Sequence, residues 1–203
     1  MDMTRALVVG AAGRRASFYA WRDRLGVMEK GLLALSAAAF IGLCAQLSIP
    51  LPFTPIPLSL QTFAIASSAV ALGWGWGILA SGLYVGLAAA GMPWLVGLRG
   101  GWAAVAGPTG GYLLGFVLMA VAMSRFGRDP SRCRWLPTWL AWFLSDVFLI
   151  LLPGSIWLYF WLNAAGSPTD WAGAFAKGFL PFVVADFFKS GAASLAVAWL
   201  GRR

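Results

Sequence analysis

The chain is a succession of apolar stretches separated by short connections, and this pattern constrains its fold more than any other feature. Hydrophobic residues make up 60% of the 203 residues, and charged residues only 11%. A soluble domain carries about 25% charged residues, so this chain could not cover its surface with polar groups. We therefore predict an all-α integral membrane protein, because helices satisfy their own backbone hydrogen bonds within a lipid bilayer.

Basic residues indicate how the helices are oriented. Six lie within residues 1–30, four in the 125–134 loop and two at the C-terminus. The positive-inside rule then predicts six crossings with both termini in the cytoplasm. The net charge of +8 does not indicate nucleic-acid binding, because these residues form short clusters and no continuous stripe. We expect a multi-pass membrane protein.

Two regions follow from this reading. Residues 1–29 form a basic cytoplasmic extension, with an amphipathic piece around Phe18–Leu25 at the membrane surface. Residues 30–203 form the membrane domain. Its expected spans are residues 30–49, 62–74, the stretch ending near 91, 110–124, 136–162 and 174–200. The fifth span contains Pro153-Gly154, which predicts a kink.

The absence of several residue types excludes several kinds of chemistry. The chain has no histidine, and its two cysteines, Cys44 and Cys133, cannot form a disulfide framework. A zinc site or a histidine-based catalytic triad is therefore excluded. There is also no Walker motif, so any ATP hydrolysis must come from partner proteins. We expect no metal, no cofactor and no catalytic residue.

Asp186 and Lys189 stand out because they lie inside an apolar stretch, LPFVVADFFKSGAA. Three residues apart in a helix, they share one face. Each charge inside a bilayer costs about 2.5–3.5 kcal/mol on insertion scales, so the pair must face protein or a cavity. One interpretation is a buried ion pair that only pins helix packing. The other is a binding site with aromatic neighbours at Phe182, Phe187 and Phe188.

Two long connections are expected on the outer side, above this pair. Residues 50–61 contain four prolines, which predict a stiff extended loop acting as a plug or lid. Residues 92–109 form an apolar loop whose only charge is Arg99. It leads into Gly107–Gly111, where Thr109 is a plausible N-cap of the fourth span. Such a helix start can hold a carbonyl or carboxylate group.

Small and polar residues within the spans allow further hypotheses. Ala34 and Ala38 are spaced to let another helix approach closely, either from this protein or from another subunit. Tyr84 places a hydroxyl near the middle of the third span. Asp146 lies within the fifth span, where we expect a structural polar contact.

Four segments together resemble a known family. PFTPIPLSLQTF, GMPWLVGLRGG, AGPTGGYLLGF and PFVVADFFKS are similar to the BioY family, the biotin-specific substrate-binding (S) components of energy-coupling-factor (ECF) transporters. GPTGGY followed about seventy residues later by Asp-x-x-Lys carries most of this resemblance. It covers Lys30 to Leu200 and does not include Met1 to Met28.

The resemblance implies a six-helix S-component fold in a bacterial cytoplasmic membrane, which binds biotin from outside the cell. It also implies a transmembrane coupling (T) subunit and ATP-binding subunits as partners. Ala34 and Ala38 lie where such proteins carry the small residues that meet the coupling subunit. The chain is thus expected to capture biotin for uptake and not to act as an enzyme.

Biotin suggests roles for individual residues. Asp186 is expected to accept from the ureido N–H groups, and Lys189 to donate to the ureido carbonyl. Arg99, or backbone N–H groups near Gly107–Gly111, would hold the carboxylate. Phe53, Trp94 and Phe187 are candidates to pack on the ring. The remaining candidates for the substrate site are Gln61, Tyr84, Gly107, Thr109, Gly110 and Tyr112.

Three alternatives remain at this point. The chain is an S component for another vitamin, a secondary transporter that acts alone, or an intramembrane aspartyl protease that uses Asp146 and Asp186. Against the protease, neither aspartate lies in a Tyr-Asp or Gly-x-Gly-Asp setting. Lys189 would also compete for one of the two carboxylates.

Overall fold

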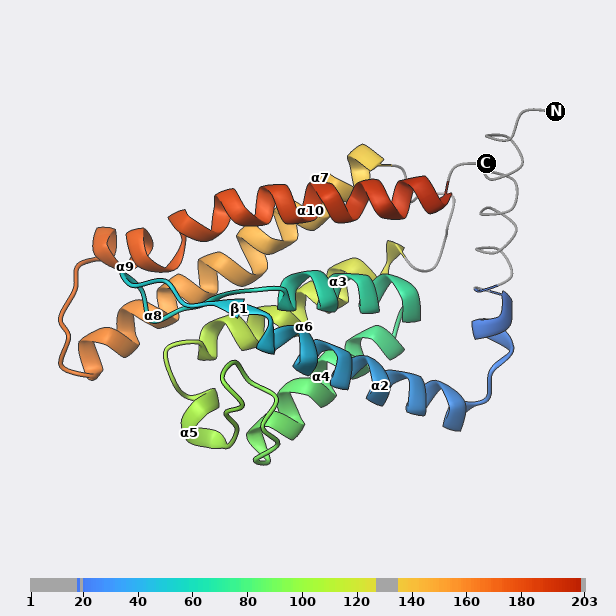
Figure 1. Cartoon of the computed structure of the whole chain (residues 1–203), viewed down its shortest axis with the longest axis horizontal. Helices are drawn as coiled ribbons and strands as arrows, with labels where there is room; N and C mark the ends of the chain where they lie inside the picture. Colours follow the sequence, from blue (N-terminus) through green and yellow to red (C-terminus); the bar gives the residue numbers. More distant parts are fainter. Residues whose placement is uncertain (1–17, 19, 127–134, 202–203) are drawn as a thin grey trace.

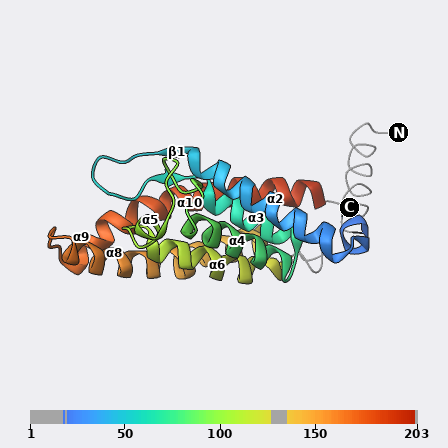
Figure 2. The same ribbon diagram turned by 90° about the horizontal axis from the view of Figure 1, so that it is seen from below.

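Apolar helical segments follow one another along the chain and pack side by side along the long axis of the molecule (Figure 1). The computed structural model describes residues 18, 20–126 and 135–201. The start of α2, the α3–α4 turn and the end of α10 lie at one end of the bundle. The proline-rich loop, α5 and the α8–α9 connection lie at the other end, as Figure 2 also shows.

The first half of the chain contains α2 (Val27–Gln46), α3 (Gln61–Leu72) and α4 (Trp76–Ala89). The prolines between α2 and α3 prevent helix formation, so the chain is extended there, as predicted. Its two ends pair as short antiparallel strands, β1 (Ser48–Ile49) and β2 (Leu58–Ser59). An all-α prediction did not include this pairing. It closes the base of the loop and directs the chain back over the bundle.

Glycines make the tight connection between α3 and α4. Gly73 and Gly75 have φ angles of 74° and 87°, a left-handed conformation that favours glycine. The loop after α4 folds back on itself through a bridge between Leu95 and Arg99 and contains the four-residue helix α5 (Trp102–Val105). It ends at α6 (Gly110–Ser124), whose bounds match the predicted fourth span.

The second half contains two interrupted helices. The first comprises α7 (Trp135–Ser145), the π-helical segment η3 (Asp146–Leu151) and α8 (Leu152–Ala164). The predicted interruption thus appears as a wider helical turn directly before Pro153, a residue that lacks an N–H donor. The second comprises α9 (Trp171–Gly178) and α10 (Leu180–Gly201). A break at Phe179 divides the predicted sixth span.

Helix α6 is central and packs closely on η3 and α8, because glycines on its surface remove the side chains that would keep the helices apart. A Cβ atom on Gly111 would collide with Trp157 and the Pro153 carbonyl, and one on Gly115 with the Leu149 carbonyl. Ala64, Ile65 and Ala69 of α3 belong to the same buried hydrophobic core. Large apolar side chains on the outer faces of α2, α8 and α10 remain exposed, as expected for surfaces that face lipid.

Helix lengths separate the segments into two classes. Three are long and apolar enough to cross a membrane alone: Val27–Gln46, Trp135–Ala164 and Trp171–Leu195. The apolar helices Gln61–Leu72, Trp76–Ala89 and Gly110–Ser124 are shorter. At 12 to 15 residues they extend only about 18–23 Å, less than the roughly 30 Å of a hydrocarbon core.

The structure corrects the hypothesis that Ala34 and Ala38 form an exposed docking face. Both are fully buried, and α2 packs against α4 and α3 of the same chain. Their small side chains therefore allow an internal helix contact. Open space lies instead beside Gly82 and Gly86 of α4, where an added Cβ would meet no atom within 4 Å.

Most of the predicted basic extension lies outside the described residues, as do Arg128, Arg132 and Arg134 of the basic loop. Within the described part, residues 20–24 are helical. Phe18 and Trp21 are about half exposed, whereas Arg22 is buried. The segment thus exposes two aromatic side chains, and its position at the membrane surface stays a prediction.

Candidate functional site

A cavity of about 230 Å³ lies between α10, α6, η3 and the two long loops. It contains the two charged residues of α10, Asp186 and Lys189, and its remaining wall is mainly apolar. The proline-rich loop contributes residues from Ile56 to Ser59, and the 92–109 loop contributes Arg99. The loops that the sequence placed above the charged pair therefore do converge on it.

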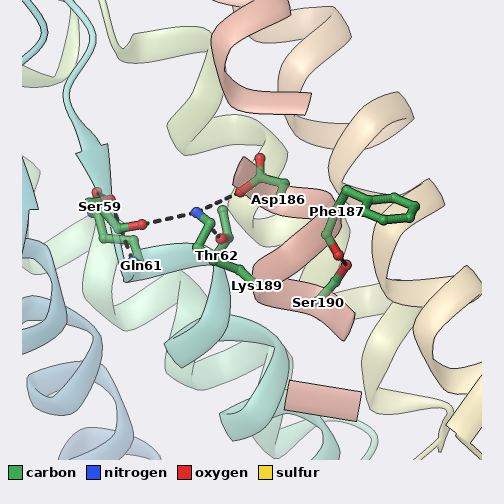
Figure 3. A network of polar contacts seen from close by, with 7 residues as sticks. All are labelled: Ser59, Gln61, Thr62, Asp186, Phe187, Lys189 and Ser190. Carbon is green, nitrogen blue, oxygen red and sulfur yellow. Dashed lines mark hydrogen bonds and ion pairs between the residues drawn. The ribbon is translucent and has the colours of Figure 1, made fainter. Parts of the chain in front are cut away.

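The Asp186–Lys189 pair is the electrostatic centre of this cavity. Lys189 Nζ lies 2.5 Å from Asp186 Oδ1, and their side chains are 20% and 3% exposed. The predicted helical spacing thus brings the two groups into contact, and α10 presents both toward the cavity (Figure 3). Removal of water from such a pair strengthens its hydrogen bonds to a polar guest.

Lys189 also reaches across the cavity wall to the segment where β2 leads into α3. Its Nζ donates to the Ser59 carbonyl at 3.1 Å and to Thr62 Oγ1 at 3.3 Å (Figure 3). With Asp186, the ammonium group has three partners, one for each of its hydrogens. Lys189 therefore fastens the end of the proline-rich loop to α10.

Gln61 extends this polar network toward α4. Its Nε2 donates to Tyr84 Oη at 2.6 Å, while its Oε1 accepts from Ser59 Oγ at 2.8 Å. Both ends of the Gln61 amide are thus held, and the residue lines the cavity. Tyr84 is fully buried behind it and does not line the cavity. Its hydroxyl fixes the orientation of Gln61.

Gln46, near the end of α2, holds the other loop. Its Nε2 donates to the carbonyls of Trp94 and Leu95 at 3.4 and 3.1 Å, and its Oε1 accepts from the Leu98 N–H at 3.1 Å. These bonds fix the chain directly before Arg99. Sequence reasoning missed Gln46, because a lone amide near a helix end gives no signal of its distant partners.

Arg99 lies at the exposed side of the cavity wall, where its Nε donates to the Val96 carbonyl at 3.1 Å. Opposite the charged pair, Gly107, Thr109 and Tyr112 line the cavity at the start of α6. Thr109 occupies the predicted N-cap position, but its side chain makes no capping hydrogen bond. Tyr112 Oη donates to the Gly178 carbonyl at 2.8 Å and ties α6 to α9.

Five of the predicted site residues lie outside the cavity. Phe187 points away from the charged pair (Figure 3). Its ring packs edge-on against Trp139 and Phe143. Phe53 is 55% exposed, so neither phenylalanine packs on a guest in this arrangement. The remaining three are Trp94, Gly110 and Tyr84. Trp94 fills the space beside Gly42, and Gly110 packs against Trp157.

Other apolar residues form the wall that was assigned to Phe53, Trp94 and Phe187. These residues are Leu95, Leu113, Phe116, Ile150, Leu151, Trp161 and Phe182. Phe182 is the one of them that the sequence had already placed beside the charged pair. It precedes Asp186 by four residues and shares its face, whereas Phe187 is turned by about 100°.

Asp146 is buried in η3 and does not line the cavity. Its Oδ1 has no hydrogen-bond partner among the described residues. The structural polar contact that we expected for Asp146 is therefore not made by this atom.

Comparison with known proteins now identifies the family. The sequence model of the BioY family matches residues 17–203. The chain belongs to the BioY family. The match begins before Lys30, so it includes part of the basic segment in which the sequence alone showed no resemblance.

Relatives and a solved structure agree with this assignment. The chain is 36% identical over 157 residues to the biotin transporter BioY of Thermotoga maritima, covering 77% of this chain and 86% of the relative. It is 31% identical over 159 residues to the biotin transporter BioY2 of Lactococcus lactis, covering 78% and 82%. A crystal structure of the S-component for biotin from an ECF-type ABC transporter matches with a TM-score of 0.73 and 25% identity, covering 87% and 92%.

Proposed function

We propose that this protein binds biotin and serves as the substrate-binding subunit for biotin uptake by an ECF-type ABC transporter. The observation that carries the proposal is the Asp186–Lys189 pair in the wall of an otherwise mainly apolar cavity. Membership of the BioY family and the named functions of its relatives support the choice of ligand. A transporter subunit of this family is not an enzyme.

Biotin suits the chemistry of the cavity at three points. Its ureido N–H groups require an acceptor, which Asp186 supplies, and its ureido carbonyl requires a donor, for which Lys189 and the Gln61 amide are in place. Its fused rings are apolar and suit the wall formed by Phe116, Trp161 and Phe182. Each hydrogen bond to a charged partner contributes about 1.5–3 kcal/mol of binding free energy, so we expect the ureido group to dominate recognition.

The valerate tail of biotin carries a negative charge that needs a cation or N–H donors. Arg99 lies at the exposed side of the cavity, and Gly107 and Thr109 lie at the start of α6. We assign the carboxylate to this side, where the ligand enters. Asp186 and Lys189, the partners of the ureido group, then lie deepest in the cavity, and the carboxylate lies nearest to water.

The wider assembly follows from the family. The chain would cross the cytoplasmic membrane six times, with both termini in the cytoplasm and the cavity open to the outside. A transmembrane coupling subunit and ATP-binding subunits would energise release to the cytoplasm. The three short apolar helices would complete their crossings with the loops that continue them.

Calorimetric titration of the purified chain with a vitamin panel tests the ligand. Biotin is expected to bind tightly without ATP, whereas riboflavin and thiamine are expected not to bind. Tight binding of another vitamin in the absence of biotin binding would disprove the assignment. Accumulation of labelled biotin in liposomes that contain this chain alone would support a secondary transporter and contradict the proposed partnership.

A further inference from the structure

A second hollow, of about 360 Å³, lies at the opposite end of the helices from the biotin cavity. It is formed where the N-terminal segment and the start of α2 meet the α3–α4 turn. The residues that line it are Arg22, Asp23, Lys30, Leu72, Gly73, Trp74 and Trp76. Its composition differs sharply from that of the biotin cavity, because cations and tryptophans predominate.

Hydrogen bonds hold both cations in place. Arg22 is only 9% exposed; its Nη1 donates to the Ala71 carbonyl at 3.1 Å, and its Nε donates to Asp23 Oδ1 at 2.8 Å. Lys30 Nζ donates to the Asp23 backbone carbonyl at 3.3 Å. Among the described residues that line the hollow, Arg22 and Lys30 are the cations and Asp23 is the one acidic group, so these residues together carry a net positive charge.

The backbone of the α3–α4 turn adds to this positive potential. Helix α4 begins beside the hollow at Trp76, and its N-cap, Gly75, has no side chain to accept from the first N–H groups. The N-terminus of a 14-residue helix carries a partial positive charge. This partial charge adds to the positive charges of Lys30 and Arg22, which are the groups that define the site.

Aromatic residues indicate the depth of the hollow in a membrane. Trp21 and Trp74 are each nearly half exposed, and the Arg125 guanidinium lies 5.6 Å from the centre of the Trp74 ring. Tryptophan with arginine or lysine at the ends of apolar helices is typical of the headgroup region of a bilayer. The hollow therefore faces phosphate groups of the adjoining leaflet.

Exposed apolar side chains continue along α2 beyond Lys30, as the helix runs from the hollow toward the middle of the bundle (Figure 1). Leu32 and Leu35 are 60% and 42% exposed. A soluble anion would make no use of them. A phospholipid would place its phosphate in the cationic hollow and its chains along this apolar surface.

We propose that this hollow binds the headgroup of an anionic phospholipid. Basic pockets between membrane helices recognise such headgroups, and each lysine or arginine near the surface contributes about 1 kcal/mol. The bound lipid would tie the N-terminal segment to the α3–α4 turn. This site is separate from the biotin cavity and does not depend on what that cavity binds.

Lipid titration of the purified chain tests the proposal. Dioctanoyl phosphatidylglycerol is added to the detergent-solubilised protein, and binding is measured by native mass spectrometry and by thermal stabilisation. Lys30→Gln is expected to weaken binding about fivefold. Lys177→Gln, which removes a lysine from α9 at the other end, is the matched control and should bind like the unaltered protein. Biotin titration of each variant confirms that it is folded.

Two comparisons decide whether the ligand is an anionic lipid. Dioctanoyl phosphatidylcholine has the same chains and no net charge, and it should bind much more weakly than phosphatidylglycerol. Inorganic phosphate lacks the chains, and it should not compete at equal concentration. The proposal is overturned if phosphatidylcholine or phosphate binds as well as phosphatidylglycerol, or if Lys30→Gln and Lys177→Gln behave alike.

Discussion

At the level of single residues, Lys189 does more than pair with Asp186. Its three donors hold Asp186, the Ser59 carbonyl and Thr62 together, so one ammonium group links α10 to the loop that covers the cavity. A ureido carbonyl that binds Lys189 must take over one of these bonds. Under the proposed binding mode, ligand binding and the position of the proline-rich loop would therefore be coupled through Lys189 Nζ.

Substitution of the charged pair separates binding from packing. Asp186→Asn and Lys189→Ala are each expected to weaken biotin binding by about 1.5–3 kcal/mol, measured by calorimetry. The double variant should not recover affinity. Phe187→Leu is the matched control, because its ring lies on the same helix but away from the cavity, and it should bind normally.

A purely structural pair would behave differently. Loss of one partner would then lower the free energy of unfolding by about 3–5 kcal/mol, because an uncompensated charge would stay buried, and the double variant would be milder. Melting temperatures of the same variants measure this. A stable double variant with unaltered affinity for biotin would show that the ligand binds elsewhere.

Tyr84 tests whether a residue outside the cavity affects binding through another residue. Tyr84→Phe removes the acceptor for Gln61 Nε2 and should lower biotin affinity by about 0.5–1.5 kcal/mol, because the amide is no longer held. Tyr159→Phe serves as the control, since that ring stacks on Trp171 at the far end of α8. Equal affinities for both variants would contradict the role assigned to Tyr84.

At the level of elements, the sequence predicted where most helices lie, but it did not predict what each helix face contacts. The bounds of α6 and of the α3–α4 turn were predictable, because glycine and proline act locally. The pairing of β1 with β2 and the break at Phe179 were not, since both depend on distant packing. Ala34 and Ala38 illustrate the limit, because a small-residue spacing predicts close contact without naming the partner. The site was anticipated at most of its polar residues and at Phe182, and missed at Trp161 and the rest of the apolar wall.

Gln46 allows the connection between α2 and the 92–109 loop to be tested. Gln46→Leu removes the bonds to Trp94, Leu95 and Leu98, and each is worth about 1 kcal/mol. Amide hydrogen exchange at Leu98 should become faster, and biotin should dissociate more quickly. Ser36→Ala, on the exposed side of α2, should change neither quantity. Unaltered exchange at Leu98 would mean that other contacts hold the loop.

At the level of the whole molecule, the two ends of the bundle differ in chemistry. One end has the proline-rich loop, Arg99 and the biotin cavity, and the other has the basic N-terminal segment and the tryptophan-rich turn. The proposed function would use this polarity, because the chain would take its ligand from one side of the membrane and act with its energising partners on the other. Orientation in the membrane is therefore the property that connects the fold with uptake.

Cysteine labelling in intact cells tests this orientation with groups that the chain already provides. Cys133 lies in the basic loop and should react with a membrane-impermeant maleimide only after the cells are permeabilised. Ser167→Cys, placed in a Cys133→Ser background between α8 and α9, should react in intact cells, because that connection lies at the same end as the biotin cavity. Cys44 is buried and should stay unlabelled in both states. Labelling of Cys133 in intact cells would invert the orientation, and the cavity would then open to the cytoplasm, where it could not capture an external vitamin.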